Sequence, residues 1–205
     1  MDTFAYIILS FVILIMIWMI LQRKSKDKIQ YESWKQFAKQ RGYNYNLGVI
    51  SGNYKGIPFS ISRYAHESIT GLSVLGTLLD KDKGKIYTIF KFKIATLPEG
   101  LQIYLREMLT NSETILTAKA NNHPIETNDK EFDKLIAVRG SNADLVLKYL
   151  SPIRKSILLK YFNILRDSNV QEDGLYLSYP ERLDDLDILD KLHKQLGDFA
   201  VELVK

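Results

Sequence analysis

Three histidines, His66, His123 and His193, come first because imidazole acts as a base or a metal ligand near neutral pH. No two of them stand four residues apart, the spacing that places both on one helical face in the H-E-x-x-H motif. His66 and His123 lie in expected loops, and His193 lies beside the apolar stripe of an expected C-terminal helix. We interpret each as a surface or half-buried structural residue and predict no metal site.

Two glycine-containing stretches approach known motifs without matching them. Residues 71–76, GLSVLG, are one residue too long for the G-x-S-x-G turn, and no buried strand precedes them to expose the serine. Residues 80–84, DKDKG, begin like a calcium loop, but glycine falls fifth and Lys91 falls twelfth, where the motif needs glycine sixth and glutamate twelfth. We therefore predict a flexible loop and a solvated hairpin turn.

The remaining candidates for chemistry are also explained by ordinary structure. The acidic group of Asp184, Asp185, Asp187 and Asp190 could suggest magnesium, but acidic residues at a helix start complement the helix dipole. Neither glycine-rich phosphate motif occurs. The chain has no cysteine, which excludes disulfides, thiolate metal sites and a cysteine nucleophile. The sequence therefore predicts no catalytic residue, no metal and no cofactor, although a site assembled from dispersed residues stays open.

The formal net charge of +4 is concentrated near the N-terminus. Residues 1–22 carry −1, residues 23–28 carry +3, and residues 29–205 carry only +2. A nucleic-acid-binding domain usually has a concentrated basic face. Because the excess lies beside an apolar run instead, we predict no nucleic-acid partner and expect contact with a lipid bilayer.

The apolar run at residues 4–21, FAYIILSFVILIMIWMIL, has Ser10 as its one polar member. At about 1.5 Å per residue it would span about 27 Å, close to the hydrocarbon thickness of a bilayer. No basic n-region precedes it and no small-residue cleavage site follows, so a retained anchor is favoured over a signal peptide. The residues expected at the membrane interface are Trp18, Arg23, Lys24, Lys26 and Lys28. The basic bias predicts a single-pass cell-membrane protein with its N-terminus outside and a cytosolic domain.

Beyond the anchor, the period of the apolar residues predicts a helix and then strands. Residues 29–41 form the helix, with Gly42 as its end. A hairpin over 43–64 with its turn at Lys55-Gly56, a strand over 85–94 with apolar residues at alternate positions, and a strand over 101–106 follow. These make an antiparallel meander of about four strands.

The second half mixes strands and helices. Ser151-Pro152 is typical of a helix start, Asp173-Gly174 of a hairpin turn, and residues 183–204 form a strongly amphipathic helix. The predicted fold class is α+β: a transmembrane helix (1–28), then one globular domain (29–205) with the meander and a helix-richer second half. Two packed subdomains, about 43–107 and 121–205, are the alternative.

Part of the sequence resembles bacterial membrane-anchored domains of unknown function. Residues 131–164 contain an F-D stretch, a short helix ending in L-S-P and a further helix, and a hairpin follows at DGLYLSYP. ISGNYKGIPFSI resembles an upstream G-x-Y-x-G stretch of such proteins. Leu135-Ile136 departs from the pattern, which has phenylalanine there. The resemblance implies one folded unit across both halves and no activity.

These observations favour a cytosolic binding or scaffolding domain with an unidentified protein partner. Two alternatives remain open. A membrane-tethered enzyme would place His66 or His123 beside carboxylates in a deep pocket. A lipid-handling module at the membrane surface would contain an elongated apolar cavity.

Overall fold

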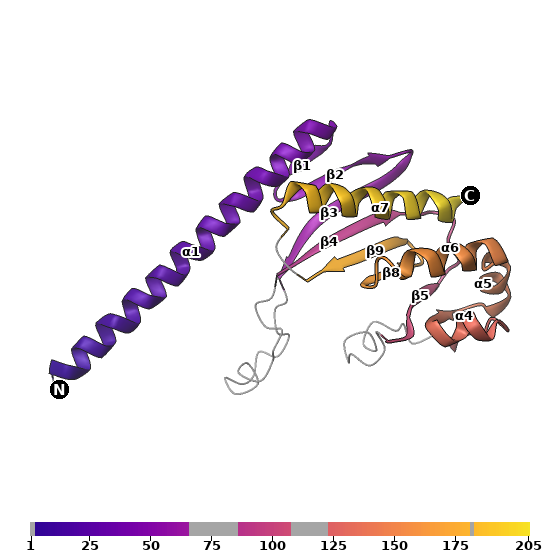
Figure 1. Ribbon diagram of the computed structural model, residues 1–205, viewed down its shortest axis with the longest axis horizontal. Coiled ribbons are helices and arrows are strands. Elements are labelled where there is room, and N and C mark those ends of the chain that lie inside the picture. Colours follow the sequence, from indigo (N-terminus) through magenta and orange to yellow (C-terminus); the bar gives the residue numbers. More distant parts are fainter. Residues whose placement is uncertain (1–2, 66–85, 108–122, 181–182) are drawn as a thin grey trace.

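The computed structural model describes residues 3–65, 86–107, 123–180 and 183–205. Helix α1 (Thr3–Arg41) is 39 residues long, and Figure 1 shows its N-terminal part extending away from the rest of the chain. Its C-terminal part packs on the domain through buried Trp34, Phe37 and Ala38. Gly42, at a φ of +68°, ends the helix as predicted.

The predicted transmembrane anchor over residues 1–28 is contradicted. Across the ranges just given, no helix combines the length and apolar character that crossing a membrane requires. The helix that contains the apolar run does not end at the basic cluster but continues through it, as far as the packed turn at Arg41. The transmembrane anchor in the predicted fold class is therefore wrong. The predicted localisation is wrong as well: a single-pass protein of the cell membrane with its N-terminus outside and a cytosolic domain.

One antiparallel sheet contains all nine described strands, in the order β1-β2-β3-β4-β9-β8-β5-β7-β6. The strands of the first half are β1 (Asn44–Asn46), β2 (Val49–Tyr54), β3 (Ile57–Ala65), β4 (Ile86–Lys93) and β5 (Gln102–Leu105). Those of the second half are β6 (His123–Pro124), β7 (Ile136–Gly140), β8 (Ser168–Gln171) and β9 (Gly174–Tyr179).

The predicted four-stranded meander is only partly correct. Strands β2, β3 and β4 are neighbours, and Lys55-Gly56 turns the chain between the first two. Strand β5 does not follow β4 in the sheet, because the β8–β9 hairpin lies between them and β9 pairs with β4. The Asp173-Gly174 turn that joins β8 to β9 was predicted correctly.

In the described part of the chain, four further helices flank the sheet. They are α4 (Lys130–Leu135), α5 (Ala143–Tyr149), α6 (Pro152–Phe162) and α7 (Leu186–Val204). Ser151 caps α6 with Pro152 in its first turn, as the sequence predicts. In Figure 1, α7 lies across one face of the sheet, while α4, α5 and α6 gather at the end away from α1.

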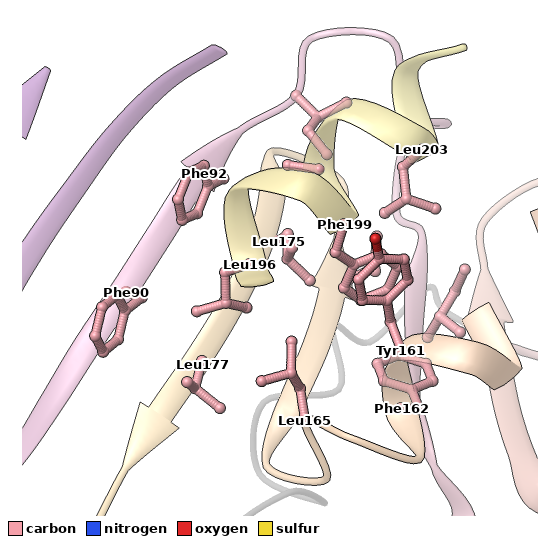
Figure 2. Packing of buried hydrophobic residues seen from close by; sticks show 14 of the residues in the cluster. Phe90, Phe92, Tyr161, Phe162, Leu165, Leu175, Leu177, Leu196, Phe199 and Leu203 are labelled. Atoms are coloured by element: carbon pink, nitrogen blue, oxygen red, sulfur yellow. The ribbon is translucent and has the colours of Figure 1, made fainter. Parts of the chain in front are cut away.

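The core lies between the sheet and helices α6 and α7. Figure 2 shows Phe90 and Phe92 of β4 and Leu175 and Leu177 of β9 directed toward α7. The rings of Tyr161 and Phe199 stack with centroids 4.6 Å apart and join α6 to α7. Strands from both halves of the sequence contribute to this core, which holds α7 and the C-terminal part of α1 in fixed positions.

Candidate functional site

A pocket of about 400 Å³ lies where α1 meets the β1–β2 turn, within the size range of small-molecule sites. Helix α1 supplies one wall, the β1–β2 turn supplies the opposite wall, and β3 supplies one side chain. The described lining residues are Gln30, Tyr31, Trp34, Tyr45, Leu47, Gly48, Val49 and Arg63. The pocket therefore combines aromatic, aliphatic, amide and guanidinium groups.

Gln30 is the unusual member of this set. Its side chain is 3% exposed, and neither its Oε1 nor its Nε2 has a hydrogen-bond partner among the described residues. A buried amide normally has partners, since leaving its donors and acceptor unpaired costs free energy. A buried polar side chain at the wall of a pocket is a candidate for contact with a ligand.

Two aromatic contacts fix the walls. The Trp34 Nε1 donates a hydrogen bond of 2.6 Å to the carbonyl of Leu183, which holds the indole in one orientation. Tyr31 and Tyr45 meet edge to face with ring centroids 5.2 Å apart and link α1 to β1. The Trp34 ring is therefore oriented by its bond to Leu183, and the two tyrosine rings position each other.

The charges near the pocket have both signs. Burial raises the pKa of the Tyr45 hydroxyl above its usual value of 10.0, and nearby Tyr31 and Glu32 raise it further. Arg63 acts on the same pKa in the opposite direction. Tyr45 therefore stays neutral near pH 7.

The turn that forms the outer wall has a specific backbone conformation. Leu47 and Gly48 both have positive φ, +46° and +80°, as in the tight turns that join antiparallel strands. Leucine seldom adopts this conformation, and the Leu47 side chain is 92% exposed at the rim. An exposed apolar side chain held at a pocket entrance is suited to contact an apolar part of a ligand.

A smaller pocket, of about 150 Å³, lies between β5, α4 and α6. Arg166 makes a bidentate pair with Glu107 there, at 2.9 and 3.0 Å. Arg106 donates to the carbonyl of Asp133 at 2.9 Å. These contacts engage Arg106, Glu107 and Arg166 within the chain, so this pocket is a weaker candidate.

His193 was predicted at the surface or half-buried, but it is 2% exposed. Burial lowers the pKa of its imidazole from 6.5 to about 4; Asp190 opposes this shift and Arg41 adds to it. Five aromatic rings have centroids 4.5–5.8 Å from the imidazole: Phe37, Tyr43, Tyr54, Phe59 and Phe92. The imidazole is neutral at pH 7 and serves as a core side chain.

The other sequence candidates do not converge on a site. His123 is exposed on β6, so it lacks the deep pocket that the enzyme hypothesis requires. His66 and the stretches 71–76 and 80–84 fall outside the described residues. Within the described residues, no three histidine, aspartate or glutamate side chains are grouped so that they could hold a metal ion.

The acidic group near α7 has structural roles in the described chain. Asp185 caps the helix by accepting hydrogen bonds from the backbone N–H groups of Asp187 and Ile188, at 2.9 and 3.1 Å. Asp190 pairs with Arg41 of α1. The helix starts at Leu186 rather than at residue 183, because Asp185 is the cap.

The predicted membrane-interface residues all lie on α1. Trp18 and Lys28 are exposed, whereas the side chains of Arg23, Lys24 and Lys26 lie outside what the structure describes. Neither Trp18 nor Lys28 is among the described residues that line the pocket.

Sequence reasoning missed Gln30, although its spacing carried a signal. Gln30 precedes Trp34 by four residues and Phe37 by seven, which places it on the buried stripe of the helix. Residues 29–41 were predicted to be helical, but no buried face was assigned to this helix. Extending the buried face of the helix by one turn from Trp34 places a polar residue, Gln30, among apolar ones, and this exception could have identified it as a candidate.

No family model matches the chain, and no curated protein matches it. The fold is similar to the crystal structure of the mycobacterial trehalose monomycolate transport factor A, TtfA. The sequences are 10% identical, the TM-score is 0.51, and the match covers 85% of this chain and 94% of that chain. At this identity the likeness shows the fold alone, so ligand and activity are not transferred by it. The resemblance to bacterial domains of unknown function stays a prediction.

Proposed function

We propose that this chain is a binding domain for an amphipathic, lipid-type ligand and that the ligand is contacted at the pocket between α1 and the β1–β2 turn. The observation that carries the proposal is the composition of the pocket. Its walls join the aromatic rings of Tyr31, Trp34 and Tyr45 to the amide of Gln30 and the guanidinium of Arg63. Such a mixture suits a ligand with one apolar and one polar part.

The position of the pocket supports the same function. Two of its lining side chains with large apolar surfaces are exposed: Tyr31 on α1 and Leu47 on the turn. Burying such side chains against an acyl chain is favourable by about 25 cal/mol for each Å² removed from water. The elongated internal cavity expected for lipid handling differs from this pocket, which lies at the junction of a helix and a turn. A short part of a lipid fits it better than a whole chain.

The fold comparison also supports the proposed binding of an amphipathic ligand. The similar structure is named as a transport factor for trehalose monomycolate. A shared fold does not fix a shared ligand, so the proposal is limited to an amphipathic ligand and to binding without chemistry.

The chain contains two tryptophans, which allows a direct test. Trp18→Phe leaves Trp34, on the pocket wall, as the one source of indole fluorescence. We would titrate this variant with octyl glucoside, octyl tetraethylene glycol ether and dihexanoyl phosphatidylcholine, each below its micelle concentration. We expect a saturable change in Trp34 emission with at least one amphiphile.

A matched control tests the location. Leu47→Asp places a charge on the exposed turn and should weaken binding, whereas Ile164→Asp changes an exposed apolar residue beyond the C-terminus of α6, away from the pocket. Equal effects of the two variants would contradict the location. Unchanged Trp34 emission with every amphiphile, in protein with native circular dichroism, would contradict the proposed function.

A further inference from the structure

The amide of Gln30 sets a chemical requirement for whatever binds beside it. Its Oε1 accepts hydrogen bonds and its Nε2 donates two. Neither atom has a partner among the described residues. The ligand group that satisfies both atoms must therefore be able to donate and to accept.

The position of Gln30 on α1 makes this requirement informative. The next buried residues on the same face, Trp34, Phe37 and Ala38, are apolar and pack against the domain. A leucine or methionine at position 30 would continue the stripe without an unpaired polar group. The glutamine therefore stands where the packing of the helix alone would favour an apolar side chain.

We infer that the pocket binds an uncharged, hydroxyl-bearing head group and that Gln30 is the residue that determines this specificity. The inference rests on the proposed function and names the polar part of its ligand. A hydroxyl both donates and accepts, so two adjacent hydroxyls satisfy both ends of the amide. An ionised phosphate accepts only and an ammonium donates only, so each would leave one end of the amide unpaired.

The walls agree with an uncharged head group. Tyr31, Trp34 and Tyr45 provide ring surfaces that pack against the C–H groups of a polyol. Arg63 and Glu32 have opposite effects on the pKa of the Tyr45 hydroxyl, so their fields partly cancel at the ring. The amide atoms of Gln30 are themselves covered, so binding includes a rotation of this flexible side chain toward the cavity.

The test compares head groups on equal chains in the full-length Trp18→Phe protein. Octyl glucoside carries several hydroxyls, and octyl tetraethylene glycol ether carries mainly ether oxygens that accept. We expect octyl glucoside to bind about tenfold more tightly than octyl tetraethylene glycol ether, because the ether leaves one or two hydrogen bonds to the amide unmade. Gln30→Leu should remove this preference and leave the binding of the ether nearly unchanged.

Two controls separate specificity from folding. Gln36→Leu changes an exposed glutamine on the same helix and should keep the preference. Gln30→Met provides a second apolar variant, and both position-30 variants should unfold at a higher temperature than the parent because an unpaired amide is removed. For Gln30→Leu and Gln30→Met we therefore expect a higher melting temperature together with loss of the preference for octyl glucoside.

Free methyl glucoside distinguishes the source of the head group. Binding of octyl glucoside without methyl glucoside would assign the site to a lipid head group, and binding of both would extend it to free sugars. Equal affinity for the two amphiphiles, unaltered in Gln30→Leu, would overturn the inference and leave the proposed function intact. Binding of methyl glucoside but of no amphiphile would uphold the inference and overturn the proposed function.

Discussion

Gln30 and His193 are both buried polar side chains on helices that pack against the sheet, α1 at β1 and β2 and α7 at β3, β4 and β9. Each has a side-chain atom with no hydrogen-bond partner in the described residues: both amide atoms of Gln30, and Nε2 of His193. Their surroundings differ. His193 is enclosed by aromatic rings, the nearest being Phe59 at 4.5 Å between centroids, whereas Gln30 stands at the wall of a pocket.

This difference shows that burial without a partner does not by itself identify a binding residue. Aromatic rings pack closely against His193, which lines neither of the two pockets described above, so its unpaired nitrogen is a cost that the packing of the rings offsets. At Gln30 the neighbouring space allows a ligand to satisfy the amide. The two positions should therefore respond differently to pH, to added volume and to removal of the polar group.

The largest expected effect is a loss of stability in acid that depends on His193. Burial holds its pKa at about 4 in the folded chain, against 6.5 when unfolded. The unfolded state therefore binds more protons in this range, and the stabilisation present above pH 6.5 is lost as the pH falls toward 4. The difference corresponds to about 3 kcal/mol at 1.36 kcal/mol per pKa unit.

Urea unfolding at pH 7 and pH 4 measures this effect. His193→Phe keeps the aromatic shape and should remove about 3 kcal/mol of the acid dependence. His123→Gln, at an exposed position on β6, is the control and should retain it. An equal acid dependence in the parent and in His193→Phe would show that other groups are responsible.

Substitutions that add a larger side chain should distinguish the closely packed region around His193 from the pocket beside Gln30. A Cβ at Gly197 of α7 would lie 2.4 Å from Cδ1 of Tyr54, beside the His193 cluster, whereas a Cβ at Gly48 in the pocket wall would meet nothing within 4 Å. Gly197→Ala should cost about 2 kcal/mol through overpacking. Gly48→Asn should cost only a few tenths, because asparagine tolerates positive φ.

Thermal unfolding and urea midpoints compare the two glycine variants directly. Similar losses at positions 197 and 48 would mean that the two regions are packed equally tightly, and the contrast drawn above would fail. A Tyr54→Leu background should relieve part of the Gly197→Ala loss, since the ring is the contacted group.

Removal of the polar group should have opposite consequences at the two positions. Gln30→Leu is expected to stabilise the free protein by about 1 kcal/mol, because a desolvated amide without partners disappears. At pH 7, His193→Leu should destabilise it, because the aromatic contacts of the imidazole are lost. Destabilisation by Gln30→Leu would indicate that the amide is satisfied within the folded chain.

Local features of the fold could be predicted from the sequence, while distant pairings could not. The turns at Lys55-Gly56 and Asp173-Gly174 and the alternation in β4 depend on adjacent residues, and each was recognised. The insertion of β8 and β9 between β4 and β5 depends on pairing between residues more than 80 positions apart, such as Phe92 with Leu175. No local pattern encodes that order.

The same reasoning explains the candidate site and the corrected anchor. The apolar run and the basic cluster were interpreted as a membrane boundary, whereas no helix in the described residues is long and apolar enough to cross a membrane. The burial of His193 and Gln30 depends on contacts between α1, α7 and three strands, which hydropathy along one segment does not reveal. Many residues near Gln30 in the sequence are charged or polar, so no apolar pattern there predicted a pocket.

The smallest expected effect concerns the ion pair between Arg41 of α1 and Asp190 of α7. Both residues act on the pKa of the nearby His193. Both side chains are partly exposed, Arg41 at 50% and Asp190 at 36%, so Asp190→Asn should cost at most about 0.5 kcal/mol at pH 7. Asp190 also opposes the lowering of the His193 pKa, and its removal should move the acid transition to lower pH. Histidine proton resonances followed through an acid titration measure this shift, with Asp187→Asn, at the solvated start of α7, as the control. A transition displaced equally by both substitutions would show that the general charge of the helix, and not the Asp190 side chain, acts on the buried imidazole.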